Sequence, residues 1–264
     1  MVRRRRGLVM GIFSAKGGVG KTTTVANLGA AISQKLKGKV IITETNMTAS
    51  NLGLHLGIVD PPVVIQDVVY GRVKISDAII KTEYGLHVLP GSVAYTEEVG
   101  PIDLSPVIEE LRKKYSLVLL DTAPGFAMEV IAGMKVSDEI LVCCQPHVPA
   151  IAGTLQTFRM ADRMKLPVFG VVMTRVAGKR YEIPITDIRR TLGWPTLVQI
   201  PEDDMVPESI TRGVPVVMYS PNSPAAVEYR KLAQMVISHL RARKRKHLGA
   251  RKRKTSKSTG KRRR

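Results

Sequence analysis

Three glycines and two lysines lie close together in residues 14–24, which read SAKGGVGKTTT. Glycines allow successive backbone N–H groups to turn toward an anion, because no Cβ atom blocks the approach. The lysine and threonine at 21–22 add a positive charge for phosphate oxygens and a hydroxyl ligand for Mg²⁺. The segment therefore predicts a phosphate-binding loop rather than a merely glycine-rich turn.

The loop matches the pattern G-x-x-x-x-G-K-[ST] at Gly20, Lys21 and Thr22, while Ala15 stands at the first glycine position. We expect Lys21 to reach the β- and γ-phosphates of a nucleotide and Thr22 to bind Mg²⁺. A helix beginning near Lys21 would direct the positive end of its dipole at the same phosphates. The predicted nucleotide contacts in this loop are Lys16, Gly17, Gly18, Val19, Gly20, Lys21, Thr22 and Thr23.

Short apolar runs alternate with helical stretches along the chain, and several runs are continuously apolar, as in parallel strands covered on both faces. This alternation predicts an α/β fold with a doubly wound, mostly parallel sheet, helices on both faces and ligands at the carboxyl ends of the strands. Together with the loop it predicts the P-loop NTPase fold. The predicted strands are 8–14, 39–43, 86–89, 116–121, 139–144, 167–173 and 196–200. The predicted helices are 21–36, 63–70, 75–81, 103–114, 149–164, 185–191, 204–212 and 223–242.

The net charge of +19 is concentrated at the two ends of the 264-residue chain. Residues 241–264 hold 14 Lys and Arg and no acid, and residues 3–6 are four arginines. Elsewhere 23 basic residues stand against 22 acidic ones, so the body is nearly neutral. We therefore expect a single domain over 7–242, a basic arm at 1–6 and a disordered polybasic tail at 243–264.

Other features of the composition favour a cytoplasmic protein. Cys143 and Cys144 are adjacent, which suits buried thiols in a strand better than a disulfide, and no C-x-x-C metal pair exists. The N-terminal MVRRRRGLVMGIFSA imitates a secretory signal, but its apolar run leads into the phosphate loop and is needed there as a strand. The sequence contains no run of 18 apolar residues, so no membrane-spanning helix is predicted.

The segment KGGVGKT at 16–22 resembles the deviant phosphate loop of the MinD/ParA family of ATPases. The resemblance covers almost all of residues 7–240 and is nearer to MinD, especially the archaeal MinD-type proteins, than to ParA. Its further segments are SNLGLHLG at 50–57, LLDTAPGF at 119–126, CCQPHVPAIAGT at 143–154, MTRV at 173–176, IPED at 200–203 and SITRGVPVVMYSPNSPAAVEYRKLA at 209–233.

This resemblance implies ATP and Mg²⁺ as ligands and a homodimer that sandwiches ATP. Lys16 would then reach across the dimer interface to the nucleotide of the partner subunit. Asp121 would hold a Mg²⁺-bound water, and Gly125 would sense the γ-phosphate through its backbone N–H. The segments that would flank the adenine contribute Thr174, Arg175, Pro201 and Glu202.

One position departs from the family pattern. Proteins near MinD carry D-x-D where this chain has Glu44 and Asn46, and the second Asp is implicated in positioning the attacking water. An amide cannot accept a proton as a carboxylate does, so we expect slow hydrolysis of ATP. The longer Glu44 side chain is an alternative source of the carboxylate. The catalytic candidates are Lys16, Lys21, Glu44, Asn46 and Asp121.

The carboxyl end departs from the pattern as well. MinD proteins bind membranes through a short amphipathic helix, whereas residues 241–264 hold one bulky apolar residue, Leu248, and no aromatic residue. A polybasic tail neutralises nucleic-acid phosphates without sequence preference, and it can also contact an anionic lipid surface.

Three functions fit these features. The first is an ATPase that positions chromosomes, plasmids or other cargo, or places cell division, by loading onto nucleic acid. The second is a positioning ATPase on anionic membranes. The third is a hydrolysis-deficient ATP-binding adaptor. An iron–sulfur carrier is excluded because the chain lacks C-x-x-C. All three are cytoplasmic, the first associated with the nucleoid and the second peripheral at the membrane.

Overall fold

The computed structural model describes residues 6–94 and 102–259, with side chains described as far as Arg245. Within these residues the chain forms an eight-stranded sheet in the order β3-β4-β2-β5-β1-β6-β7-β8. Neighbouring strands are parallel except for β3, which runs antiparallel to β4 at the edge. The strands are β1 Leu8–Phe13, β2 Val40–Glu44, β3 Ile80–Lys81, β4 His87–Leu89, β5 Leu117–Asp121, β6 Glu139–Cys144, β7 Val168–Val176 and β8 Thr196–Pro201.

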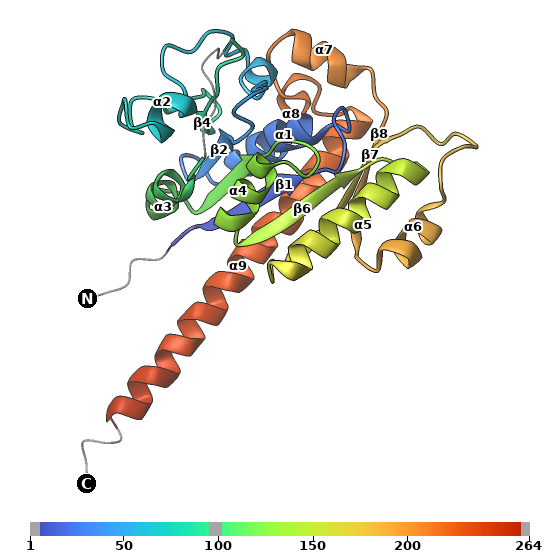
Figure 1. Cartoon of the computed structure of the whole chain (residues 1–264). Coiled ribbons are helices and arrows are strands. Elements are labelled where there is room, and N and C mark those ends of the chain that lie inside the picture. The colour runs from blue at the N-terminus through green and yellow to red at the C-terminus, as the bar shows by residue number, and fades with distance from the viewer. Residues whose placement is uncertain (1–5, 95–101, 260–264) are drawn as a thin grey trace.

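Helices cover both faces of the sheet (Figure 1). Helices α1 and α9 pack on one face together with the short α8, and α2 to α6 supply the apolar side chains that pack on the other. The helices are α1 Lys21–Ser33, α2 Ile65–Val69, α3 Ser105–Lys114, α4 Met128–Val136, α5 Val148–Arg163, α6 Ile185–Leu192, α7 Met205–Thr211, α8 Val216–Tyr219 and α9 Pro224–Thr259. A 3₁₀ helix, η1, spans Leu54–Leu56.

The central strand β1 shows how one segment serves both faces. Leu8, Met10 and Ile12 belong to the core under α1 and α9, whereas Val9 and Phe13 belong to the opposite cores. Side chains alternate between faces along a strand, so a strand buried on both sides must be apolar throughout. This burial confirms the predicted doubly wound, mostly parallel sheet.

Each of the seven predicted strands forms, but one predicted helix does not form, and the sequence failed to predict two α-helices and one strand. The helix predicted at 75–81 is absent, and Ile80–Lys81 forms the edge strand β3 instead. The cause is pairing with β4, a contact that local sequence does not reveal. Helices α4 and α8 were not predicted, because α4 (MEVIAGMKV) is apolar nearly all round and α8 has only four residues.

Helix α9 begins in the body and continues beyond it as one long helix (Figure 1). Its packed side chains end at Leu240, and Glu139 of β6 contacts His239 and Arg243 on either side of that residue. The sequence predicted disorder from residue 243, whereas the structure is helical through Thr259. Arg, Lys and Ala favour helix and extend one that packing has already nucleated. The remainder of the predicted tail, 260–264, lies outside the described residues.

The predicted N-terminal arm at 1–6 is described only at Arg6, whose guanidinium lies 3.1 Å from the Glu109 carboxylate. Among the described helices, none is long and apolar enough to cross a membrane.

Candidate nucleotide-binding site

A cavity of about 740 Å³ lies beyond the carboxyl ends of the strands. The loop between β1 and α1 lines it, together with the segments that follow β2 and β5, the ends of β7 and β8, and residues of α7. This is the position expected for a ligand in a parallel α/β sheet. The predicted site residues that line it are Lys16, Gly17, Gly18, Gly20, Lys21, Thr22, Thr23, Asn46, Thr174, Arg175, Pro201 and Glu202.

The glycine-rich loop has the backbone conformation that its composition predicts. Gly18 and Gly20 adopt φ angles of 74° and 83°, in the left-handed region that favours glycine. The Thr174 hydroxyl of β7 donates a hydrogen bond of 2.6 Å to the Val19 carbonyl and fixes the loop to the sheet. Val19 is therefore buried behind the loop and does not line the cavity.

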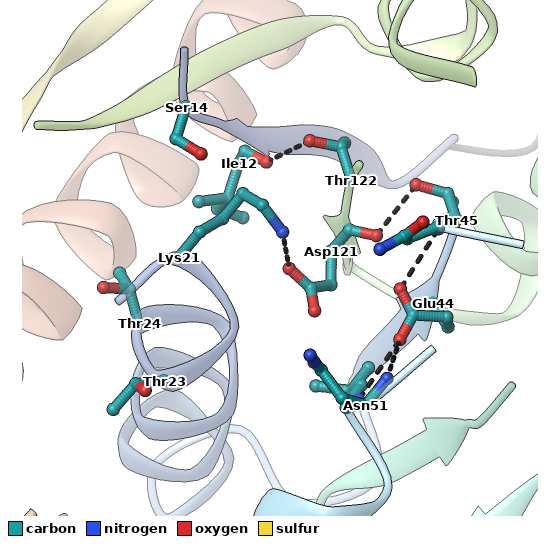
Figure 2. A network of polar contacts seen from close by, with 12 residues as sticks. Ile12, Ser14, Lys21, Thr23, Thr24, Glu44, Thr45, Asn51, Asp121 and Thr122 are labelled. Atoms are coloured by element: carbon teal, nitrogen blue, oxygen red, sulfur yellow. Dashed lines mark hydrogen bonds and ion pairs between the residues drawn. The ribbon is translucent and has the colours of Figure 1, made fainter. Parts of the chain in front are cut away.

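Lys21 and Asp121 form an ion pair at the first turn of α1 (Figure 2). Lys21 Nζ lies 2.6 Å from Asp121 Oδ1, and the two side chains are only 8% and 1% exposed. A buried ammonium needs an anionic partner, because burial removes its hydration. The Thr45 hydroxyl donates to the Asp121 carbonyl at 2.9 Å, so the end of β5 is held as well.

Glu44 ends β2 and faces the following loop instead of the cavity (Figure 2). Its Oε1 accepts the Asn46 N–H at 3.1 Å, and its Oε2 accepts the N–H groups of Asn51 and Leu52 at 3.0 and 3.1 Å. Burial, followed by the nearby Asp121 carboxylate, raises the pKa of Glu44 to about 8. Glu44 therefore organises the loop that carries Asn46.

Asn46 does line the cavity, and its amide is held by its own loop. Nδ2 donates to the Ala49 carbonyl at 2.9 Å, and the Thr48 hydroxyl lies 3.5 Å from Oδ1. The cavity thus presents a neutral amide at the position where the sequence pattern leads one to expect a carboxylate. Gly125, a predicted site residue, does not line the cavity; its φ is 83°, and its N–H donates to the Ser14 carbonyl at 3.0 Å.

The far end of the cavity is formed by the ends of β7 and β8, which are adjacent in the sheet. Arg175 and Glu202 form an exposed ion pair of 2.8 Å there. The cavity also has apolar lining residues, Ile200, Val206, Pro207 and Ile210. None of them was a predicted site residue, although Ile200 and Ile210 lie in segments that carry the family resemblance. Such an apolar lining suits the face of a nucleotide base. The α7 residues of this lining come soon after the IPED segment, and this proximity was the signal in the sequence that could have indicated them.

His55 is a second cavity residue that the sequence did not single out, because no other histidine stands at a metal-ligand spacing from it. It projects from η1, and its Nε2 lies 3.2 Å from the Thr23 hydroxyl. Burial lowers the pKa of this imidazole from its usual value. His55 therefore connects the loop after β2 to the first turn of α1.

Comparisons with known proteins identify the family of this chain. A family described as "AAA domain" matches residues 7–167. An uncharacterized ATP-binding protein of Methanocaldococcus jannaschii is 30% identical over 87% of this chain and 88% of its own length. The chromosome partitioning protein ParA of Caulobacter vibrioides is 30% identical over 90% of this chain and 97% of its own length. The chain belongs to the MinD/ParA family of P-loop ATPases.

Solved MinD structures share the whole fold of this MinD/ParA-family chain. The cell division ATPase MinD of Pyrococcus furiosus superposes with a TM-score of 0.84 and 31% identity, over 88% of this chain and 99% of that one. The septum site-determining protein MinD of Pyrococcus horikoshii, solved with Mg-ADP, gives a TM-score of 0.82 and 30% identity, over 87% and 96% of the two chains.

The donor atoms of this MinD/ParA-family site fit a Mg²⁺ ion that arrives with its nucleotide. Thr22 offers a hydroxyl and Asp121 a carboxylate, and Mg²⁺ prefers oxygen ligands. Among the residues whose side chains are described, no group of three or more His, Cys, Asp or Glu could hold a metal. Mg²⁺ commonly keeps water and phosphate oxygens as its remaining ligands, so no larger protein cluster is required.

Proposed function

We propose that this chain is an ATP-dependent dimerising switch of the cytoplasm that positions cargo, such as a chromosome, plasmid or division site, by loading onto nucleic acid. ATP with Mg²⁺ occupies the cavity, and Lys16 contacts the nucleotide of the partner subunit. The observation that carries the nucleic-acid assignment is the cationic extension of α9. Residues 241–264 hold 14 Lys and Arg and no acid, next to a nearly neutral body.

The geometry of α9 supports this assignment. The helical segment 241–259 would extend about 28 Å at 1.5 Å per residue. Such a rod can follow a duplex, which carries one phosphate per roughly 1.7 Å of axis, and release its counterions. The same segment offers a membrane little apolar area, because Leu248 is its one large apolar residue.

A truncation tests the nucleic-acid assignment. Removing 246–264 deletes ten basic residues but keeps Leu240 packed and keeps the contact between Arg243 and Glu139. We expect the full chain with ATP to shift duplex DNA, with an affinity that falls steeply with salt, and the truncated chain to lose this binding. Unchanged DNA affinity in the truncated chain would contradict the proposal. Binding to anionic but not neutral vesicles, without DNA binding, would favour the membrane alternative.

Turnover tests the switch itself. We propose that Asn46 slows hydrolysis and prolongs the ATP-bound state, because an amide cannot accept the proton of the attacking water. We expect Asn46→Asp to raise kcat for ATP at least about tenfold while the Kd for ATP changes little. Brisk turnover by the natural chain, unchanged by this substitution, contradicts a slow switch. Background turnover in both, with ATP-dependent dimerisation intact, favours the adaptor.

A further inference from the structure

A second carboxylate stands close to position 46, and it comes from a different segment of the chain. Glu129 lies in the first turn of α4, beyond the DTAPG segment that follows β5. It is half-buried, and it lines the same cavity as Lys21, Thr22 and Asn46. The sequence did not single it out, because α4 itself was not predicted.

The contacts of Glu129 place its carboxylate beside the Asn46 amide. Oε1 accepts the Met47 N–H at 3.2 Å, and Oε2 lies 3.4 Å from the Thr48 hydroxyl. The same hydroxyl lies 3.5 Å from Asn46 Oδ1. The Thr48 hydroxyl is therefore a common neighbour of Asn46 and Glu129. A carboxylate offers about four acceptor sites, so two contacts leave Glu129 able to accept a hydrogen bond from water.

The other carboxylates near the cavity contact other groups or lie at its opposite end. Glu44 is buried against three backbone N–H groups and does not line the cavity. Asp121 faces Lys21, at the position expected for Mg²⁺. Glu202 and Asp203 line the opposite end, where Glu202 pairs with Arg175 and Asp203 accepts the Met205 N–H. Among the described residues, Glu129 is the cavity carboxylate next to position 46.

We propose that Glu129 supplies the carboxylate that orients and deprotonates the attacking water, in place of the acid missing at position 46. The inference rests on the proposed function, since it requires ATP hydrolysis. The water oxygen forms a bond to the γ-phosphorus, and the bond from that phosphorus to the β,γ-bridging oxygen breaks. The electron pair of the broken bond leaves with ADP. One proton of the water passes to Glu129 and then to solvent, and the other stays on the released phosphate.

The test compares kcat and ATP affinity in four chains: natural, Glu129→Gln, Asn46→Asp, and both together. We expect Glu129→Gln to lower kcat about 100-fold, within the range for loss of a general base, and to leave the Kd for ATP within about threefold. The double variant should recover kcat to within about tenfold of the natural chain, because it returns a carboxylate to the water from position 46. A purely structural role of Glu129 would not be rescued in this way.

Glu182→Gln is the matched control. Its carboxylate also holds loop N–H groups, those of Ala177 and Gly178 at 2.8 and 2.9 Å, but it does not line the nucleotide cavity. It should leave kcat unchanged. Natural-like turnover in Glu129→Gln overturns the inference, and so does a loss that Asn46→Asp fails to rescue or a loss of ATP binding. If the natural chain binds ATP but does not turn it over, hydrolysis fails as a function together with the inference.

Discussion

Lys21 Nζ and Asp121 Oδ1 lie 2.6 Å apart, and the two side chains are only 8% and 1% exposed. An internal carboxylate therefore positions the lysine that we expect to bind phosphate. A nucleotide phosphate would have to take over from Asp121 as the partner of Lys21. Asp121 would then be released for a Mg²⁺-bound water, so one carboxylate serves both states of the site.

The first prediction follows from this exchange. Asp121→Asn leaves the buried Lys21 ammonium without an anion, and breaking a buried pair costs about 3–5 kcal/mol. We expect the free energy of unfolding without nucleotide to fall by about that amount, and Mg²⁺-dependent ATP affinity to fall as well. Urea denaturation and nucleotide titration measure the two effects.

Asp138→Asn provides the control, since Asp138 pairs with Arg112 at 2.8 Å, away from the cavity. It should cost stability but leave ATP affinity unchanged. Natural ATP affinity in Asp121→Asn would show that Asp121 has no part in the metal-bound state.

The local part of the site could be read from the sequence because its chemistry is local. Gly18, Gly20 and Lys21 are neighbours in the chain, and their residue types determine the loop conformation and its charge. The continuous apolar runs likewise predicted a buried parallel sheet, and hence the edge where the loops converge. The sequence also placed Arg175 and Glu202 at one end of the site, and they form an ion pair there.

The remainder depends on contacts between distant segments. Glu129 and His55 reach the cavity because α4 and η1 are packed there by the sheet, and no spacing in the sequence connects them to Lys21. The direction of the Glu44 side chain is set by three N–H groups of the following loop. Strand β3 exists only through its pairing with β4. Tertiary packing decides each of these cases.

The second prediction concerns the backbone contact between Gly213 and Gly57. A Cβ atom at Gly213 would lie 2.5 Å from Gly57 Cα, so Gly213→Ala must push the loop after η1 away. We expect a loss of stability of about 2–4 kcal/mol, from this clash and from the positive φ of 65° together. Gly178→Ala has the same conformational strain at φ 68° but open space around it, and should lose only about 1–2 kcal/mol. Equal losses in urea denaturation would contradict the clash.

The third prediction concerns pH. Burial lowers the pKa of His55 below its unfolded value, so between these two values the unfolded chain binds more protons than the folded chain. Stability contributed by the neutral imidazole is therefore present above the unfolded pKa and is lost as pH falls toward the folded pKa. We expect the unfolding free energy of the natural chain, relative to His55→Gln, to fall as pH drops from about 7 to 5. A difference that stays flat or grows on acidification would contradict this assignment.

The fourth prediction separates the two lysines of the loop. The Lys16 side chain is exposed at the mouth of the cavity, whereas Lys21 is buried on Asp121. If Lys16 serves the partner subunit, Lys16→Ala should bind ATP within about threefold of the natural affinity, because the phosphates keep Lys21 and the loop N–H groups. It should nevertheless remain monomeric with ATP when examined by light scattering.

Lys21→Ala is the matched control for that prediction. It removes the charge that we expect to face the β- and γ-phosphates, so ATP binding itself should be lost, and dimerisation with it. An ATP-dependent dimer in Lys16→Ala would exclude a contact across the interface as the role of Lys16. If Lys16→Ala lost as much ATP binding as Lys21→Ala, both ammonium groups would contact the nucleotide of their own subunit. The difference in burial between the two lysines would then need another cause.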